Sequence, residues 1–227
     1  MFFFFSCQNA QENIALEIYV ANRLSEMQPN ATVTLYANQD DWLAEKNPLQ
    51  ESKITDKDGK VRFFRLKNGI FYIDVKKDGS TNWEGKATSI INTTRSFDLR
   101  SDFLIITQNQ SSLLASAEGK KWKASAAYLN GEDIFELLDD CITDNLLIFY
   151  KGSREGIYEE EENTLKCDSK DPQIVSGTWE IDELGTTIST KTSILSEKLN
   201  IISLDENQLV INKNFLGYTI EIIYQKQ

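Results

Sequence analysis

Short runs in which apolar and polar residues alternate dominate the first half of the chain. LEIYV (16–20), TVTLYA (32–37) and FYIDVK (71–76) each make every second side chain apolar. That is the period of a strand with one buried and one solvated face. RSFDLR and DFLIIT follow, and the turn signals DKDG, NG and DG separate the runs. The pattern predicts a β-sandwich of about seven strands.

The second half is predicted to be a barrel. Ile134, Leu137 and Leu138 share one face of a short helical turn in GEDIFELLDD, but the other runs resemble strands. Eight strands joined by hairpin-length links favour a closed up-and-down antiparallel barrel, because closure removes both sheet edges. The predicted fold class is therefore all-β. The eight runs are KWKASAAYL, DNLLIFY, REGIYEE, SGTWEI, TTISTK, KLNIISL, QLVIN and YTIEIIY.

Charge separates the two halves. Residues 8–112 contain 13 basic and 14 acidic residues, whereas residues 113–227 contain 11 and 21. The polar stretch TQNQSS (107–112) between them has no periodicity and is predicted to be a short linker. We therefore expect a sandwich domain over 14–108 and a barrel domain over 113–227.

The chain opens with four phenylalanines, Ser6 and Cys7. An apolar run followed by a small residue and a cysteine resembles the bacterial lipobox, in which the cysteine is lipidated. The resemblance departs at Phe5, where a smaller residue is commoner, and no basic segment precedes the phenylalanines. Residues 1–13 are interpreted as a truncated lipoprotein signal and a polar tether. An ordinary hydrophobic terminus is the alternative.

Composition narrows the function. The net charge of −11 disfavours nucleic acid as a partner. The absence of histidine removes the commonest general base and metal ligand, which shifts the expectation away from hydrolases and zinc enzymes. No run of 18 apolar residues predicts a membrane-spanning helix. We expect no catalysis, no cofactor and no metal.

Cys141 and Cys167 flank one predicted hairpin. In a cytosolic protein they would be buried thiols or part of a metal site, whereas in an exported protein they are most simply a disulfide. Three cysteines leave one unpaired, and lipidation of Cys7 would account for it. The bridge would stabilise the fold by roughly 3.5 kcal/mol in the loop-entropy model.

Two longer patterns resemble known families. ATVTLYANQDDW followed by ITDKDGKVRFFRLKNGIFYIDVKKDG is similar to the prealbumin-like or carboxypeptidase-regulatory-like sandwich modules of bacterial surface proteins. GKKWK, the CITDNLLIF segment, Cys167, GTW and the terminal YTIEIIY resemble, in that order, the lipocalin-like domains of Bacteroidota-type lipoproteins. The match departs at Asn145, where an acidic residue is usual. The resemblance implies a lipid-anchored protein of the outer membrane or cell envelope, on either the periplasmic or the surface face.

Several further residues have two interpretations. The aromatics Trp122, Phe149, Trp179 and Tyr224 either fill the barrel core, which is the default, or line a ligand cavity. The acidic run EEEEN (159–163) is expected to be a solvated hairpin tip, with a calcium site as the alternative. DKDG is expected to be a β-turn because its spacing fails as an EF-hand. Trp42 and Trp83 are candidates for exposed contacts or edge packing, and Asp139 and Asp140 for an acid–base pair.

The favoured function is a non-catalytic binding or interaction module of a cell-envelope lipoprotein. Its partners would be the membrane through Cys7 and either a small hydrophobic ligand or an envelope protein. One alternative is a lipocalin-type carrier, which requires a deep mouth lined with Phe, Ile and Tyr and is disfavoured by a filled interior. The other is an enzyme of unrecognised type, which requires a cleft with converging carboxylates or lysines.

Overall fold

The structure, a computed structural model, describes residues 13–95, 97–193, 195–215 and 217–227. It divides into two compact units, Met1–Thr107 and Gln108–Gln227, and each has its own hydrophobic core. The stretch predicted as a linker contains helix α2 (Gln110–Leu114). Asn109 caps this helix by accepting a hydrogen bond from the Ser112 N–H at 2.9 Å. That capping signal went unrecognised in the sequence.

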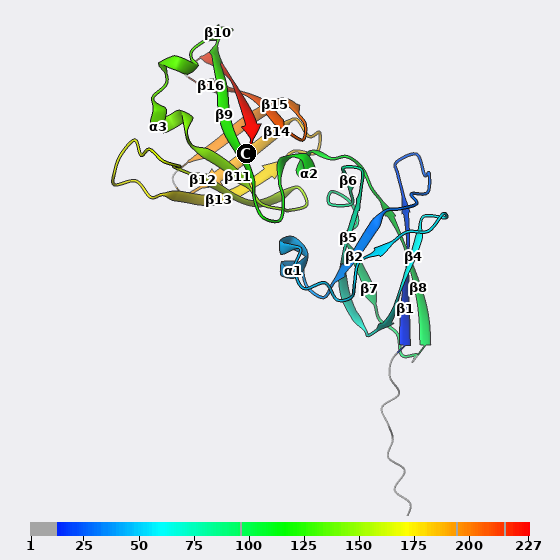
Figure 1. The fold of residues 1–227 in the computed structure, drawn as a ribbon. Helices are drawn as coiled ribbons and strands as arrows, with labels where there is room; N and C mark the ends of the chain where they lie inside the picture. The colour runs from blue at the N-terminus through cyan, green and yellow to red at the C-terminus, as the bar shows by residue number, and fades with distance from the viewer. Residues whose placement is uncertain (1–12, 96, 194, 216) are drawn as a thin grey trace, which may run out of the picture. The chain divides into compact units, whose positions relative to one another are not determined.

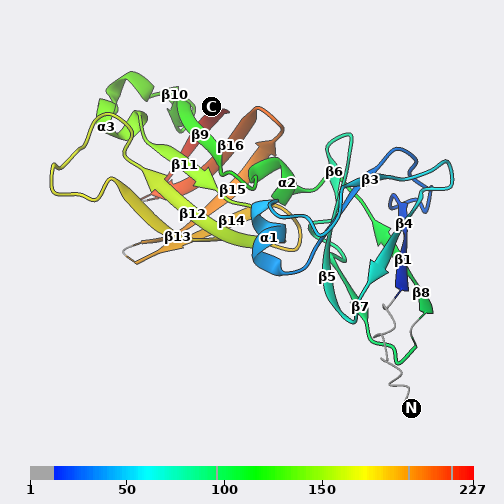
Figure 2. The same ribbon diagram turned by 60° about the horizontal axis from the view of Figure 1, so that its bottom comes forward.

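The first unit is a sandwich of two sheets (Figures 1 and 2). The smaller sheet has the order β4-β1-β8, with β1 (Asn13–Ala21) antiparallel to β4 (Lys60–Leu66) and parallel to β8 (Phe97–Ile105). The runs RSFDLR and DFLIIT are therefore one strand. Within the described residues the unit has eight strands, one more than predicted, because two of them are only two residues long. The second sheet contains β2 (Thr32–Tyr36), β3 (Lys53–Ile54), β5 (Gly69–Lys77), β6 (Ser80–Thr81) and β7 (Thr88–Ile91).

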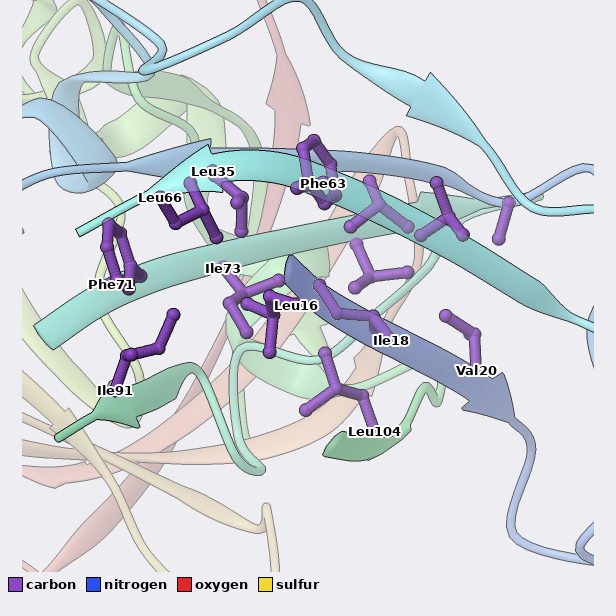
Figure 3. Close-up of a cluster of buried hydrophobic side chains, with 14 of the residues drawn as sticks. Leu16, Ile18, Val20, Leu35, Phe63, Leu66, Phe71, Ile73, Ile91 and Leu104 are labelled. Carbon is purple, nitrogen blue, oxygen red and sulfur yellow. The ribbon is translucent and has the colours of Figure 1, made fainter. Parts of the chain in front are cut away.

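The alternating residues of β1 build the core of this sandwich. Leu16, Ile18 and Val20 point toward the facing sheet, where they meet Leu35 and Ile73 (Figure 3). All five side chains are fully buried. Each large aliphatic side chain removed from water in this way contributes about 1.5–3 kcal/mol to folding. The period-2 pattern of the sequence therefore identified the buried face correctly.

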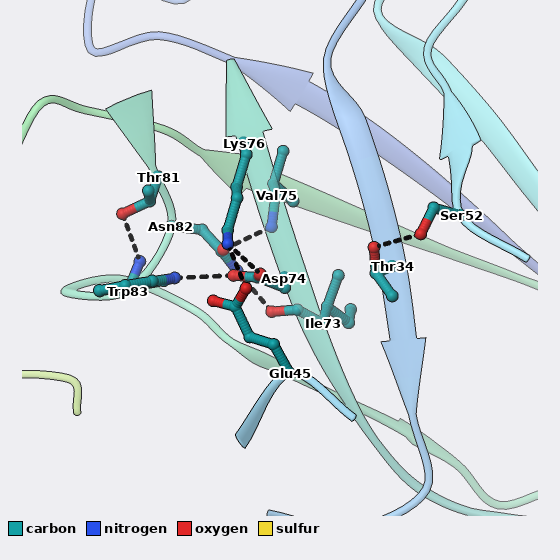
Figure 4. Close-up of polar contacts among 10 residues, drawn as sticks. All are labelled: Thr34, Glu45, Ser52, Ile73, Asp74, Val75, Lys76, Thr81, Asn82 and Trp83. Carbon is teal, nitrogen blue, oxygen red and sulfur yellow. Dashed lines mark hydrogen bonds and ion pairs between the residues drawn. The ribbon is translucent and has the colours of Figure 1, made fainter. Parts of the chain in front are cut away.

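A polar cluster braces strand β5 beside this core (Figure 4). The buried Asn82 side chain accepts from the Val75 N–H at 2.9 Å and donates to the Ile73 carbonyl at 3.0 Å. Trp83 donates its indole N–H to Asp74 at 2.7 Å. Trp83 and Trp42 are each only 4% exposed, so the interpretation of exposed contact residues is wrong. Trp42 belongs to α1 (Gln39–Ala44), whose apolar side packs with Trp83 and Tyr36.

The predicted turn DKDG forms the link between β3 and β4. The Asp56 carboxylate accepts from the backbone N–H groups of Asp58 and Lys60, at 2.9 and 3.0 Å. Gly59 has a φ of +67°, and a Cβ there would lie 2.7 Å from the Val20 carbonyl oxygen. The turn therefore requires glycine. Its carboxylate is used to hold the backbone, as expected for a β-turn.

The second unit is a closed eight-stranded antiparallel barrel. Each predicted run forms a strand, and the last strand pairs with the first from Ile220↔Leu129 to Lys226↔Trp122. A two-residue strand, β10 (Glu132–Asp133), pairs antiparallel with the last residues of β9. The barrel strands are β9 (Lys120–Leu129), β11 (Leu146–Phe149), β12 (Glu155–Glu161), β13 (Ile174–Ile181), β14 (Thr187–Thr192), β15 (Ser196–Leu204), β16 (Gln208–Phe215) and β17 (Tyr218–Lys226).

Short helical elements lie at opposite ends of this barrel (Figures 1 and 2). At one end is α2, and at the other are the 3₁₀ turn η1 (Phe135–Leu137) and α3 (Asp140–Thr143). The helical turn predicted in GEDIFELLDD is therefore only the 3₁₀ turn η1, and α3 begins at the last residue of that stretch, Asp140. Of the three residues assigned to its buried face, Leu137 is 80% exposed, because it lies in the 3₁₀ turn and points to solvent. In the part of the chain that the structure describes, no helix has the length and apolar character to cross a bilayer.

Candidate ligand-binding site in the barrel

Three of the four aromatics singled out in the sequence fill the α2 end of the barrel. Trp122, Phe149 and Trp179 are at most 1% exposed and pack in one cluster with Leu114 of α2. Trp122 donates its indole N–H to the Leu114 carbonyl at 2.9 Å, and Trp179 donates to the Tyr150 carbonyl at 3.0 Å. Both indole donors are therefore satisfied, as a buried tryptophan requires. These residues are core at this end.

The fourth aromatic, Tyr224, packs against the same cluster but also faces a hollow part of the interior. It borders a cavity of about 230 Å³ beneath the η1–α3 end of the barrel. Aliphatic side chains from strands β9, β11, β15 and β17 and from the segment above them form most of its wall. The lining residues are Ala124, Ala127, Ile134, Leu138, Ile142, Thr143, Asn145, Leu147, Tyr158, Glu160, Glu197, Leu199, Lys213, Ile220, Ile222 and Tyr224.

Strand alternation and one bulge bring these side chains to the interior. In β17, Ile220, Ile222 and Tyr224 all face inward because side chains two residues apart share a face. Opposite them, the pairing shifts so that Tyr224 opposes Ala124 while Ile223 opposes Ala126. The extra residue in β9 restores small alanine side chains to the interior. Small residues on β9 leave the space that larger ones would fill.

Three charged groups project into this mainly apolar space. Glu197 of β15 pairs with Lys213 of β16 at 3.0 Å. Glu160 of β12 lies near Asn145 and Tyr158, whose side chains are both neutral. Burial raises the pKa of Glu160, and the charge of Glu197 raises it further, against the lowering effects of Lys213 and Asn145. Its surroundings therefore disfavour the ionised form of Glu160.

Burial also governs the two phenols at this site. Burial first, and then the Glu160 charge, raise the pKa of Tyr158 and of Tyr224 well above the ordinary value for tyrosine. Both phenols stay protonated at neutral pH. The charge of the lining is therefore set by Glu160, Glu197 and Lys213 alone, and it is −1 when all three are ionised.

A covalent bond and a buried carboxylate tether the segment that closes this end. The disulfide Cys141–Cys167 links α3 to the β12–β13 loop, which confirms the predicted bridge. Asp144 accepts from the Thr164 hydroxyl at 2.6 Å and from the backbone N–H groups of Thr164 and Leu165, at 2.9 and 3.1 Å. Burial alone would raise the pKa of Asp144, but these hydrogen bonds outweigh it and lower the pKa. We call residues 134–145 the cap.

The acidic run was misinterpreted in the sequence. Glu159–Glu161 belong to strand β12, so they are not a hairpin tip, and their alternation turns Glu160 inward. The signal was present, because REGIYEE was itself recognised as a strand and Tyr158 and Glu160 share its inner face. Among the described residues no group of three or more His, Cys, Asp or Glu is arranged to hold a metal ion.

The remaining candidate site residues from the sequence are the pair of aspartates and the first cysteine. Asp139 and Asp140 are exposed at the start of α3, away from the cavity lining. Cys7 lies outside the described residues.

The convergence of Glu160, Glu197 and Lys213 was not foreseen in the sequence, since each residue comes from a different strand. This convergence meets one requirement of the enzyme alternative, and the expected absence of catalysis stays a prediction.

Comparison with known proteins agrees with this architecture. Residues 118–211 match the family model of the lipocalin-like domain. No curated protein matches the chain. The match lies within the barrel, from just before β9 into β16, and it extends neither to β17 nor to the first half of the chain.

Solved structures show only distant similarity. A streptococcal ancillary pilin is 12% identical over 76% of this chain, with a TM-score of 0.33. The Bacillus anthracis TIE protein is 12% identical over 95%, with a TM-score of 0.32, and the Bacillus cereus major pilin subunit BcpA is 9% identical over 94%, with a TM-score of 0.30. The chain spans 60%, 31% and 57% of these three proteins. The fold assignment of each unit rests on its own strands, and for the second unit also on the lipocalin-like match.

Proposed function

We propose that the barrel binds a small, mainly apolar molecule in the cavity under the cap, without catalysing its conversion. The observation that carries this proposal is the cavity of about 230 Å³ with aliphatic walls. Eight-stranded barrels are either filled by side chains or hold one small ligand. A cavity of about 150 Å³ with apolar walls suffices for benzene. The lipocalin-like match supports the same class of function.

Filling the cavity tests this proposal. We expect the full chain to bind the neutral probe 2-phenylethanol, measured by titration calorimetry or ligand-detected NMR. Leu138→Trp in the cap, and separately Ile222→Trp in β17, should abolish binding because the indole occupies the space. Leu184→Trp is the matched control, since Leu184 is 84% exposed in the turn between β13 and β14.

Binding that survives both cavity substitutions, or is absent from the parent chain, would overturn the proposal. The cap variant matters because Leu138 lies outside the strands, so its substitution leaves the barrel pairing intact. Circular dichroism of each variant is the control for retention of the fold. The result expected from the control is unchanged affinity.

We further propose that Cys7 is lipidated and anchors the chain in the outer membrane or another part of the cell envelope. The Phe-rich run before Ser6 and Cys7 supports this proposal. The disulfide supports it independently, because such bridges persist in oxidising compartments. Two or more acyl chains make such anchoring stable. Mass spectrometry of the chain from its own host should find acylated Cys7 as the first residue, and an unmodified Cys7 would contradict the proposal.

A further inference from the structure

The ionisable groups of the cavity lining include two carboxylates but only one cation. Glu197 and Lys213 neutralise each other across 3.0 Å. Among the described residues no ion pair involves Glu160, although Lys213 of the same lining is near enough to lower its pKa. The nearby side chains of Asn145 and Tyr158 carry no charge. The lining therefore has one carboxylate more than it has cations, and its one cation is already paired with Glu197.

A second group near Glu160 also needs a donor. The side-chain oxygen of Asn145 is buried and accepts no hydrogen bond within the part of the chain that the structure describes. Asn145 and Glu160 belong to the same lining, and Asn145 is near enough to lower the pKa of the Glu160 carboxylate. A buried acceptor without a donor costs about 1–3 kcal/mol. A ligand group with several N–H donors and a positive charge would satisfy both residues.

The cavity volume limits the size of the molecule. At about 230 Å³ it exceeds the roughly 150 Å³ that holds benzene, by enough for a short side chain. Aliphatic residues such as Leu138, Leu199 and Ile222 surround the remaining space. The ligand body is therefore apolar and of about the size of one substituted ring, with little room for a second polar group.

We propose that the cavity selects a small apolar amine, whose protonated nitrogen pairs with Glu160 while its apolar body packs under the cap. This inference rests on the proposed function, because it assigns a ligand class to the same cavity. A carboxylate of equal size is disfavoured, since it would meet Glu160 and Glu197 with only an already paired Lys213. The raised pKa of Glu160 supports the inference, because an uncompensated buried carboxylate gains most from a cation.

Three probes that share a ring and differ in charge test this preference. We expect the full chain to bind phenethylamine about tenfold more tightly than 2-phenylethanol at pH 7, and 2-phenylethanol more tightly than phenylacetate, as measured by titration calorimetry. Glu160→Gln should remove the tenfold preference for phenethylamine over 2-phenylethanol. Glu155→Gln, which makes the same charge change at an exposed position of β12, should keep it.

The outcomes separate this inference from the function on which it rests. Equal binding of the amine and the alcohol, or a preference that survives Glu160→Gln, overturns the amine assignment and leaves the binding function intact. Tightest binding of phenylacetate overturns it as well and points to Lys213. Failure of all three probes to bind at millimolar concentration overturns both proposals.

Discussion

At the scale of single residues, Gly156 shows how one missing side chain positions a core aromatic. Gly156 of β12 pairs with Trp179 of β13. A Cβ on Gly156 would lie 2.6 Å from the Tyr150 carbonyl oxygen and 2.7 Å from the Trp179 indole nitrogen. These two atoms are the partners of one hydrogen bond. The indole thus lies directly against the backbone of the neighbouring strand.

Gly156→Ala is predicted to destabilise the barrel by about 1–3 kcal/mol, the usual cost of overpacking a core. The methyl group would displace the indole and weaken its bond to Tyr150. Urea denaturation followed by tryptophan fluorescence measures the loss. Gly85→Ala is the matched control, because the nearest atom to its added Cβ is 3.6 Å away. Equal effects of the two substitutions would contradict the explanation.

Glu160 makes a prediction about pH at the same scale. Its pKa is raised above the ordinary value of 4.5, chiefly by burial and by Glu197, with Lys213 opposing. The folded chain therefore holds this proton more tightly than the unfolded chain, so ionisation costs stability as pH rises through the raised pKa. Below pH 4.5 the cost is absent.

Glu160→Gln should therefore raise the melting temperature at pH 7–8 by a few degrees and leave it almost unchanged near pH 4. One kcal/mol corresponds to about 2–4 °C for a chain of this size. Calorimetric scans across this pH range provide the measurement, with Glu155→Gln as the control. A gain that is equally large at pH 4 would show that charge is not its cause.

At the scale of elements, the cap is a segment whose position depends on tethers. It contains few hydrogen-bonded residues of its own, since η1 spans three residues and α3 four. The disulfide and the hydrogen bonds of Asp144 to Thr164 and Leu165 hold it to the β12–β13 loop. Because the cap supplies Ile134 and Leu138 to the cavity wall, its tethers also shape the site.

Replacing Cys141 and Cys167 by serine is predicted to lower the unfolding free energy of the barrel by roughly 3.5 kcal/mol, the loop-entropy value for this spacing. Hydrogen exchange should speed up first in the cap and the β12–β13 loop, because the strands keep their pairing. Chemical denaturation and exchange mass spectrometry provide the two measurements. Unchanged exchange in the cap would mean that the Asp144 hydrogen bonds hold it without the bridge.

At the scale of the whole molecule, each unit completes its own sheets. The barrel closes through β9 and β17 entirely within the second unit, and its core cluster comes from residues of that unit. The first unit has a separate core of sixteen buried side chains, including Phe63 and Leu104. A domain with its own core and no open sheet edge is expected to fold alone.

A fragment of residues 108–227 should therefore fold with the disulfide formed and with one cooperative unfolding transition. The fragment includes α2, whose Leu114 carbonyl accepts the Trp122 indole N–H. A second fragment that starts at residue 116 would lack α2 and should be less stable. Circular dichroism and thermal denaturation compare the two. A disordered longer fragment would contradict the independence of the barrel.

Much of this architecture could be predicted from the sequence, because strand periodicity is a local property. The runs from KWKASAAYL to YTIEIIY predicted all eight barrel strands, and Cys141 and Cys167 were paired correctly. The parallel pairing of β1 with β8 was missed, since it joins residues about 85 positions apart with no local signal. Helix α2 was missed because five residues are too few for a periodic pattern.

The sequence by itself determined which residues form strands and which faces are apolar, because both follow from the neighbours along the chain. The pairing of Cys141 with Cys167 was predicted only on the condition that the chain is exported, and the structure contains that bridge. Only the tertiary structure decided that the interior is filled at the Trp122 end and hollow under the cap. Glu197 and Lys213 come from the paired strands β15 and β16, but only the closed barrel brings Glu160 of β12 across the interior to them. In the sequence, a charged residue that faces the interior cannot be told apart from the solvated charged residues around it. Closure of the sheet removes its side chain from water.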